Sequence, residues 1–182
     1  MINAACSFTG HRPKKLPWKY DEGDSRCVAL KAELTAQITK LTEAGVTDFF
    51  SGMAEGTDCY CAQIVLDLHR KNPALKLHCV LPCEGQADRW SDSARERYDS
   101  ILEQADFVDY VSREYHDKCM LERNRRLVEQ AGILLAVYNG EWRGGTAATV
   151  RYARNMGRGI IMIHPVTRHI VYEGITPPPV QR

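Results

Sequence analysis

Two glycine-bearing loops combine residue types that can bind a phosphate group. Residues 51–58 read SGMAEGTD and residues 138–146 read YNGEWRGGT, and they contain the pairs Gly56-Thr57 and Gly145-Thr146. Glycine lets the backbone approach a ligand and adopt positive φ, while threonine can cap a following helix and offer its hydroxyl beside the exposed N–H groups. Each loop is a candidate phosphate cradle, and a plain helix cap without a ligand is the alternative.

Neither loop has the full pattern of a common nucleotide-binding motif. No Gly-Lys-Ser/Thr follows at Walker A spacing, and the G-x-G-x-x-G dinucleotide fingerprint is incomplete. The sequence therefore argues against ATP-driven phosphoryl transfer and against ordinary hydride transfer.

A third loop, residues 9–13 (TGHRP), carries His11 and Arg12. Both side chains could donate hydrogen bonds to a phosphate, and the Arg12 guanidinium could donate two in parallel. Pro13 disfavours helix at the residue before it, so the segment is predicted to be a turn directly after a strand. Open α/β sheets bind their ligands at such positions, and a solvated basic turn is the alternative.

Short apolar runs that alternate with longer amphipathic stretches must position these loops. The alternation predicts βαβ units and an α/β fold with a mostly parallel sheet. The continuous apolar run 133–138 predicts a central strand. The other predicted strands are 4–9, 46–50, 77–82, 107–111 and, as the final strand, 159–164. The predicted helices are 25–44, one that follows residue 58, one that ends near residue 105, 119–131 and 147–156.

Length and composition favour one globular domain, residues 1–175, followed by a proline-rich tail, residues 176–182. The net charge of +1 supplies no broad field for a polyanion, which makes nucleic acid the less favoured partner. Without a long apolar stretch, we expect a soluble, cytoplasmic protein with no membrane contact. The seven cysteines are predicted to be buried free thiols, and their spacing predicts no metal site.

The three loops, together with Glu122-Arg123-Asn124 and the helix after Gly144, resemble the YpsA-like family of the SLOG superfamily, which also contains the DprA proteins and the LOG phosphoribohydrolases. The resemblance covers roughly residues 4–164, and GHRP and SGMAEGTD are its most specific parts. It implies an α/β, Rossmann-like, doubly wound, mostly parallel sheet with helices on both faces. The loops would line its pocket for a nucleotide or a nucleotide-derived ligand. The residues expected to bind that ligand are Gly10, His11, Arg12, Ser51, Gly52, Glu55, Gly56, Thr57, Asp58, Arg123, Asn124, Trp142, Gly144, Gly145 and Thr146.

Whether catalysis follows binding is left open by the sequence. The resemblance to the LOG enzymes implies a Gly-Thr-x-x-Glu motif with an upstream arginine, and Arg123 matches that arginine, but Thr149 stands where the glutamate is expected. An arginine alone cannot act as a general base at neutral pH. Glu55 and Asp58 are the candidate carboxylates, with a solvated turn and a helix-dipole contact as their respective alternatives.

Three functions follow from these residues. The favoured one is a sensing or regulatory module that binds a phosphorylated, nucleotide-derived ligand, such as an ADP-ribose-like molecule, and that requires no cofactor. The second is an N-glycosidic hydrolase of nucleoside monophosphates. The third is a single-stranded nucleic-acid binder that uses the arginines of the predicted helix 119–131. Trp142 could stack on a base or anchor its loop on the core, and a homodimer is left open.

Overall fold

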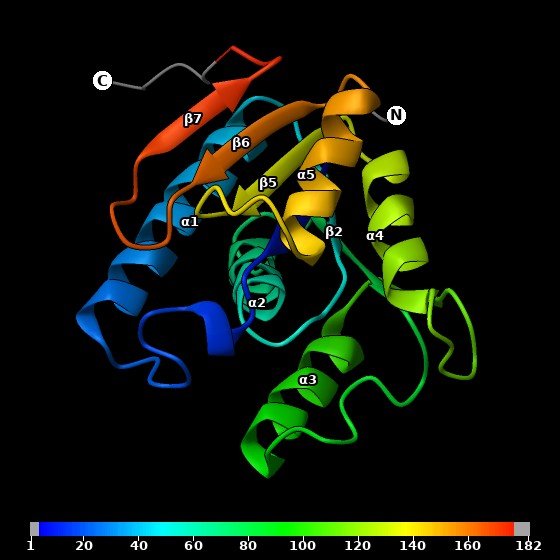
Figure 1. The fold of residues 1–182 in the computed structure, drawn as a ribbon. Coiled ribbons are helices and arrows are strands. Elements are labelled where there is room, and N and C mark those ends of the chain that lie inside the picture. Colours follow the sequence, from blue (N-terminus) through cyan, green and yellow to red (C-terminus); the bar gives the residue numbers. More distant parts are fainter. Residues whose placement is uncertain (1–3, 177–182) are drawn as a thin grey trace.

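The computed structural model describes residues 4–176 and contains one seven-stranded sheet with the strand order β4-β3-β2-β1-β5-β6-β7 (Figure 1). Strands β1 to β6 pair in parallel, and β7 runs antiparallel to β6. The strands are β1 (Ala5–Gly10), β2 (Asp48–Ser51), β3 (Lys76–Leu81), β4 (Phe107–Tyr110), β5 (Ile133–Val137), β6 (Gly159–Ile163) and β7 (Ile170–Glu173). The predicted α/β, Rossmann-like fold class is confirmed.

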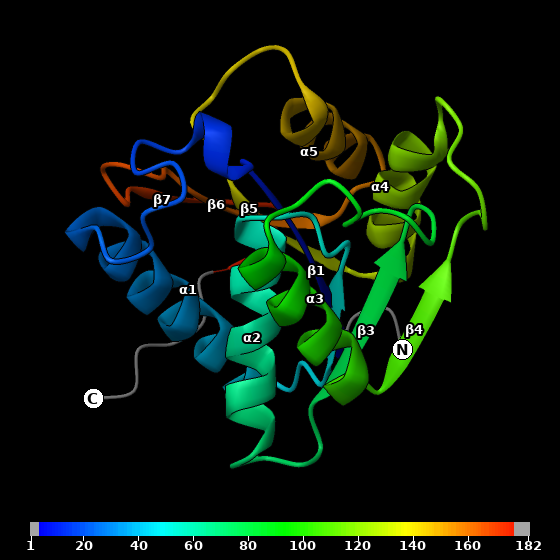
Figure 2. The same ribbon diagram turned by 90° about the horizontal axis from the view of Figure 1, so that it is seen from below.

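Helices cover both faces of the sheet, as Figures 1 and 2 show. The first three helices lie on one face and the last two on the other, which agrees with the packing of α1 on α2, α2 on α3, and α4 on α5. They are α1 (Ser25–Glu43), α2 (Thr57–His69), α3 (Asp92–Gln104), α4 (Cys119–Gln130) and α5 (Gly145–Asn155), and a short 3-10 turn, η2 (Pro13–Lys15), follows β1.

Helical spacing of apolar residues explains how these helices pack. In α1, Leu30, Leu34 and Ile38 are buried at successive turns. Asp24 caps the helix by accepting a hydrogen bond from the Arg26 N–H at 2.8 Å. The larger core lies under α1 to α3 and includes the stacked rings of Phe8 and Phe49. A smaller core lies under α4 and α5. The seven cysteines are all buried and free, as predicted.

The predicted strand 159–164 is present as β6, but the prediction that it is the final strand is wrong, because β7 follows it. The chain turns after His164, whose N–H donates to the His169 carbonyl at 2.9 Å, and β7 then pairs antiparallel with β6. A four-residue edge strand has little periodicity of its own, so its pairing with β6 is a tertiary effect. Apart from Thr176, the predicted proline-rich tail lies outside the described residues.

The order in which the chain adds strands to the sheet reverses between β1 and β5. From β1 the chain winds through β2, β3 and β4 toward one edge, then returns through α4 to β5 on the other side of β1. The parallel register pairs Gly10 with Val137, so the loops after these two strands begin side by side. Such a switch point opens a crevice at the carboxyl ends of the strands, where ligands of open α/β sheets bind.

Candidate functional site

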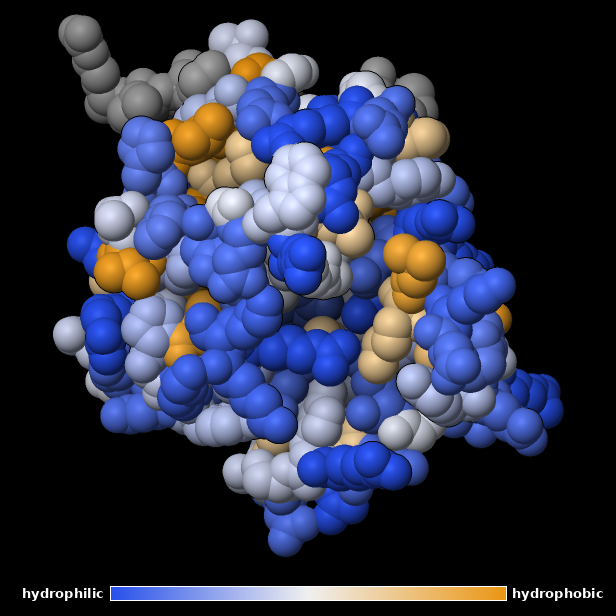
Figure 3. Space-filling view, viewed as in Figure 1, coloured by the Kyte–Doolittle hydropathy of each residue, from blue (hydrophilic) through white to orange (hydrophobic). Residues whose placement is uncertain are grey.

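A cavity of about 310 Å³ lies at this switch point, between the loops that follow β1, β2 and β5 and the start of α4. The space-filling view of the molecule shows a hollow near the middle of the displayed face, with mostly hydrophilic residues around it (Figure 3). We call the cavity the central pocket. Its lining residues are Thr9, Gly10, His11, Arg12, Lys14, Lys15, Ala54, Asp58, Arg123, Asn124, Arg143, Gly144, Gly145 and Thr146.

Arg123 is a buried cation of the central pocket, with only 3% of its surface exposed. Its Nη1 donates to the Gly52 carbonyl and lies 3.4 Å from Asp58 Oδ2, while its Nε has no hydrogen-bond partner among the described residues. A Cβ atom at position 52 would lie 1.9 Å from Arg123 Nη1. Position 52 must therefore be glycine as long as Arg123 keeps this place.

Asp58 is the carboxylate that faces Arg123, and it is 5% exposed. Its Oδ2 also accepts a hydrogen bond from the Ala54 N–H at 3.2 Å. Burial raises the pKa of Asp58, and the charge of Arg123 opposes that rise. Burial likewise lowers the pKa of Arg123, against the influence of Asp58. The two groups therefore neutralise one another inside the protein, and Asp58 holds the loop that precedes α2.

The hydroxyls of Ser51 and Thr57 hold the β2 loop instead of facing the central pocket. Ser51 Oγ donates to the Asp58 carbonyl at 3.0 Å and accepts from the Met53 N–H at 3.1 Å. Thr57 Oγ1 donates to the His11 carbonyl at 3.1 Å, which ties the β1 and β2 loops together. A Cβ at Gly10 would lie 2.5 Å from the Thr57 side chain, so this glycine makes room for the contact.

His11 joins the β1 loop to the β5 loop. The Asn139 N–H donates to His11 Nε2 at 3.2 Å, and the His11 N–H donates to the Val137 carbonyl at 3.3 Å. Burial lowers the pKa of the imidazole, which favours a neutral ring at pH 7. Because His11 Nε2 already accepts the hydrogen bond from Asn139, the predicted hydrogen bond from His11 to a phosphate would have to come from Nδ1.

Exposed cations surround the mouth of the central pocket. Arg12 is exposed, with its Nη2 lying 3.9 Å from Met120 Sδ. Lys15 forms an exposed ion pair with Glu141 at 2.5 Å across the two loops. Sequence reasoning identified Arg12 but missed Lys14, Lys15 and Arg143, although the basic run 12–15 and the arginine inside the glycine loop were visible signals.

The amino end of α5 forms one wall of the central pocket. Gly144 is its N-cap residue, with φ of 106°, and no side chain caps the helix. The nearest atom to a Cβ placed on Gly145 would be Asn124 Nδ2, at 3.9 Å, so the backbone here is open to a ligand. Uncapped N–H groups at a helix start, with the helix dipole behind them, bind anions.

Not every predicted site residue lies in the central pocket. Glu55 and Gly56 line a separate cavity of about 190 Å³ with residues of α2 and α3, so the two candidate carboxylates do not share one site. Burial raises the pKa of Glu55. Trp142 is 79% exposed, with the Arg151 guanidinium 5.3 Å above its ring centre, so it does not anchor its loop on the core.

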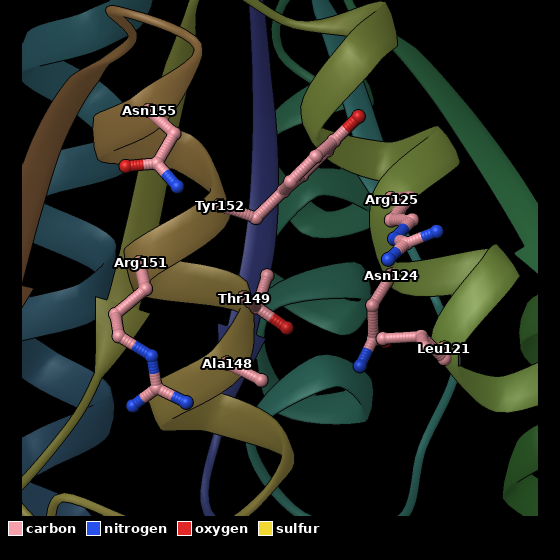
Figure 4. A pocket seen from close by; sticks show the side chains of 8 residues that line it. All are labelled: Leu121, Asn124, Arg125, Ala148, Thr149, Arg151, Tyr152 and Asn155. Carbon is pink, nitrogen blue, oxygen red and sulfur yellow. The ribbon is translucent and has the colours of Figure 1, made fainter.

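A shallow groove between α4 and α5 adjoins the central pocket through the shared residue Asn124. Figure 4 shows Asn124 and Arg125 of α4 across this groove from Thr149, Arg151 and Tyr152 of α5. Thr149, which stands where the LOG-like glutamate was expected, is buried and donates its hydroxyl to the Gly145 carbonyl at 2.8 Å. Its hydroxyl is thus engaged within the helix.

Residues 4–176 contain neither a cluster of metal-ligating side chains nor a helix that could span a membrane. No group of three or more His, Cys, Asp or Glu side chains is placed to hold a metal ion. None of the helices in this part of the chain is long and apolar enough to cross a membrane.

Known proteins resemble this chain over the part that contains the central pocket. A family model described as the YspA SLOG family matches residues 6–164. A UPF0398 protein of Bacillus pumilus is 34% identical over 152 residues, which are 82% of this chain and 81% of the relative. A UPF0398 protein of Bacillus anthracis is 30% identical over 154 residues, 83% of each chain.

Two solved structures of DNA processing protein A (DprA) have a similar fold. The Streptococcus pneumoniae protein superposes with a TM-score of 0.56 at 16% identity, and the match covers 88% of this chain and 50% of that one. The Helicobacter pylori protein, whose structure describes a binding mode for single-stranded DNA, gives a TM-score of 0.59 at 14% identity, over 88% and 65% of the two chains. This chain thus spans half to two-thirds of their length.

Proposed function

This chain belongs to the YspA SLOG family, and from that premise we propose that its central pocket binds a nucleotide or nucleotide-derived phosphorylated ligand and serves a sensing or regulatory role. One observation carries the proposal. The lining holds the cations Arg12, Lys14, Lys15, Arg123 and Arg143 against one carboxylate, Asp58, which already faces Arg123.

The backbone supports the same ligand class as these charges. The uncapped start of α5 offers N–H groups to a phosphate, and Gly145 leaves space above them. Arg12 is exposed and available to bind two phosphate oxygens. A volume of about 310 Å³ suits a molecule of mononucleotide size. The free cysteines suit a reducing compartment such as the cytoplasm, where nucleotide-derived ligands are available.

The test measures thermal unfolding with nucleoside monophosphates, ADP-ribose, NAD and cyclic nucleotides, each assayed in parallel for released base. A ligand at about 100 times its Kd stabilises by roughly 2.7 kcal/mol, which raises Tm by about 5–10 °C for a chain of this size. Gly145→Asp places a negative side chain in the cradle and should abolish the shift. Asn155→Asp adds the same charge at the other end of α5, outside the central pocket, and should keep it.

The outcomes separate the candidate functions. A shift without base release, lost in Gly145→Asp, supports a binding module. Released base would replace the proposal with an N-glycosidic hydrolase, although Thr149 offers no carboxylate and Asp58 is held by Arg123. No shift with any compound would overturn the small-ligand proposal.

A single-stranded nucleic-acid binder is the second candidate, favoured by the fold similarity to the Helicobacter pylori DprA structure and by the exposed Trp142 beside Arg151. Stacking on an exposed aromatic ring and contacts between arginine and phosphate are the features of such sites. Its affinity for an oligonucleotide should fall steeply between 50 and 200 mM salt. A response that is flat with salt would reject it.

A further inference from the structure

Two arginine side chains converge at one side of the central pocket. Arg12 Nη2 lies 3.9 Å from Met120 Sδ, and Arg123 Nη2 lies 4.0 Å from the same sulfur. A thioether sulfur is a weak, uncharged acceptor and does not balance two cations. Asp58 faces Arg123 from the other terminal nitrogen, Nη1, and within residues 4–176 no carboxylate forms an ion pair with Arg12. This side of the central pocket therefore has an excess of positive charge.

Arg123 also keeps a hydrogen-bond donor for which the protein supplies no acceptor. The side chain lines the central pocket and is 3% exposed, and its Nε has no partner among the described residues. A buried donor without an acceptor costs free energy. Burial lowers the pKa of Arg123, Asp58 raises it, and the neighbouring charge of Arg12 lowers it further. An anion held by Arg12 and Arg123 would supply both the acceptor and the missing negative charge.

The uncapped start of α5 is a second place for an anion in the same cavity. A Cβ on Gly144 would lie 3.5 Å from Lys15 Nζ, so an ammonium group stands beside the free N–H groups of the helix. Figure 4 shows α4 and α5 on opposite sides of a groove, and Met120 belongs to the first turn of α4. The two anion positions are therefore on different walls of the central pocket, and one phosphate at α5 leaves Arg12 and Arg123 without an anion.

The charges that line the central pocket also favour more than one phosphate. Lys15 is paired with Glu141, and Arg123 with Asp58. The lining has three other cations that form no ion pair with a carboxylate in the described part of the chain, namely Arg12, Lys14 and Arg143. A phosphate monoester carries about two negative charges at pH 7. A single phosphate thus leaves positive charge unbalanced.

Building on the nucleotide-binding function proposed above, we propose that the ligand of the central pocket carries a diphosphate group, with one phosphate at the start of α5 and the next between Arg12 and Arg123. A nucleoside diphosphate carries this group at its end, and an ADP-ribose-like molecule carries it between two sugars. In the second case the far part lies in the groove of about 1000 Å³ that shares Arg12 with the central pocket. Nucleoside monophosphates fill one position and bind more weakly.

The first measurement compares inorganic pyrophosphate with inorganic phosphate by titration calorimetry at low ionic strength, where exposed charges are least screened. We expect pyrophosphate to bind the full chain at least about tenfold more tightly, because it accepts hydrogen bonds at both positions. Arg12→Gln changes an exposed side chain and should bring the two affinities to within about twofold. Lys71→Gln is the control, because it removes an exposed cation before β3, outside the central pocket, and it should keep the preference.

The second measurement compares AMP, ADP and ADP-ribose, which share one nucleoside. ADP or ADP-ribose should bind at least about tenfold more tightly than AMP, and Arg12→Gln should remove most of that difference. Tighter binding of ADP assigns a terminal diphosphate, and tighter binding of ADP-ribose assigns a bridging one. Gly145→Asp, which places a negative charge at the α5 position, should weaken the binding of all three.

The outcomes distinguish this proposal from the proposed function. Equal affinities for AMP, ADP and ADP-ribose, together with equal affinities for phosphate and pyrophosphate, would overturn the diphosphate and leave nucleotide binding in place. A pyrophosphate preference that survives in Arg12→Gln would overturn the position between the two arginines. If no nucleotide binds, the proposed function fails, whereas a pyrophosphate preference that is lost in Arg12→Gln would still support the two anion positions.

Discussion

Gly52→Ala tests the central contact of the site, in which the Arg123 guanidinium lies against the backbone of the β2 loop. A Cβ at position 52 would lie 1.9 Å from Nη1, 2.6 Å from Cζ and 2.8 Å from Cδ of Arg123. These are three atoms of one buried side chain, so a small rotation cannot relieve all of them. The guanidinium must leave, and with it go the hydrogen bond to the Gly52 carbonyl and the contact with Asp58.

The magnitude follows from what remains after Arg123 leaves. Asp58 is then a buried carboxylate without its cation, and separating a buried pair costs about 3–5 kcal/mol. For a chain of this length, each kcal/mol lowers Tm by about 2–4 °C, so the expected loss is about 6–20 °C. Urea unfolding of wild type and Gly52→Ala gives the free energy directly. Gly145→Ala is the control, because its Cβ would meet no atom closer than 3.9 Å, and we expect it to stay within about 1 kcal/mol of wild type.

A double-mutant cycle isolates the proposed clash from other effects. Arg123→Ala removes the side chain that a Cβ at position 52 would meet, and it also leaves Asp58 without its cation. The double variant should therefore be destabilised about as much as Arg123→Ala alone. The interaction free energy then equals in size the loss of Gly52→Ala alone, about 3–5 kcal/mol. Additive losses, or a Gly52→Ala protein within 1 kcal/mol of wild type, would refute this reasoning.

Three other predictions concern separate parts of the fold. Burial on its own raises the pKa of Asp106, but the hydrogen bond from Lys76 at 2.8 Å helps to lower that pKa below its ordinary value of 3.8. The stabilisation that the Asp106 carboxylate contributes is therefore present above pH 3.8 and is lost as the pH falls further. Asp106→Asn should make the free energy of unfolding less dependent on acid pH by about 1 kcal/mol, as measured by urea titrations at a series of pH values. Thr57→Val leaves the buried His11 carbonyl without its side-chain donor and should lower the free energy of unfolding in urea by about 1–3 kcal/mol. Thr57→Ser keeps a hydroxyl donor and should retain most of that free energy. Equal losses in the two variants would contradict the hydrogen bond. Trp142→Ala should change stability by less than about 0.5 kcal/mol, because the ring is mostly exposed, but it should weaken oligonucleotide binding if the second candidate function is correct; fluorescence anisotropy would decide.

The sequence predicted the elements that carry strong local signals. The strand 133–138 appeared as β5 because its apolar run is continuous, and the loop 138–146 led into α5 as expected from its glycines and threonine. By contrast, β7 has four residues and depends on pairing with β6. Local propensity gives no account of that pairing.

The roles of the site residues were harder to predict than their positions in the sequence. Arg123 was grouped with Arg125 and Arg126, yet Arg123 is buried while Arg126 pairs with Asp109 at the surface. The four-residue spacing of Cys119, Arg123 and Leu127 was the available signal that Arg123 lies on the inner face of α4. Its partner across the fold, the Gly52 carbonyl, depends on how α4 docks on the sheet, which one sequence does not encode locally.

The contact between Gly52 and Arg123 also ties together the changes that these two positions could undergo over generations. With Arg123 in place, any side chain at position 52 meets the guanidinium, so the first step away from glycine is harmful. If position 123 first accepts a shorter side chain, a larger residue at position 52 costs little more, and a later return to arginine is then blocked. Both orders thus begin with a similar loss, because Asp58 loses its cation in each, and the second substitution then adds little. Descendants with a side chain at position 52 would not regain this pocket by restoring arginine alone.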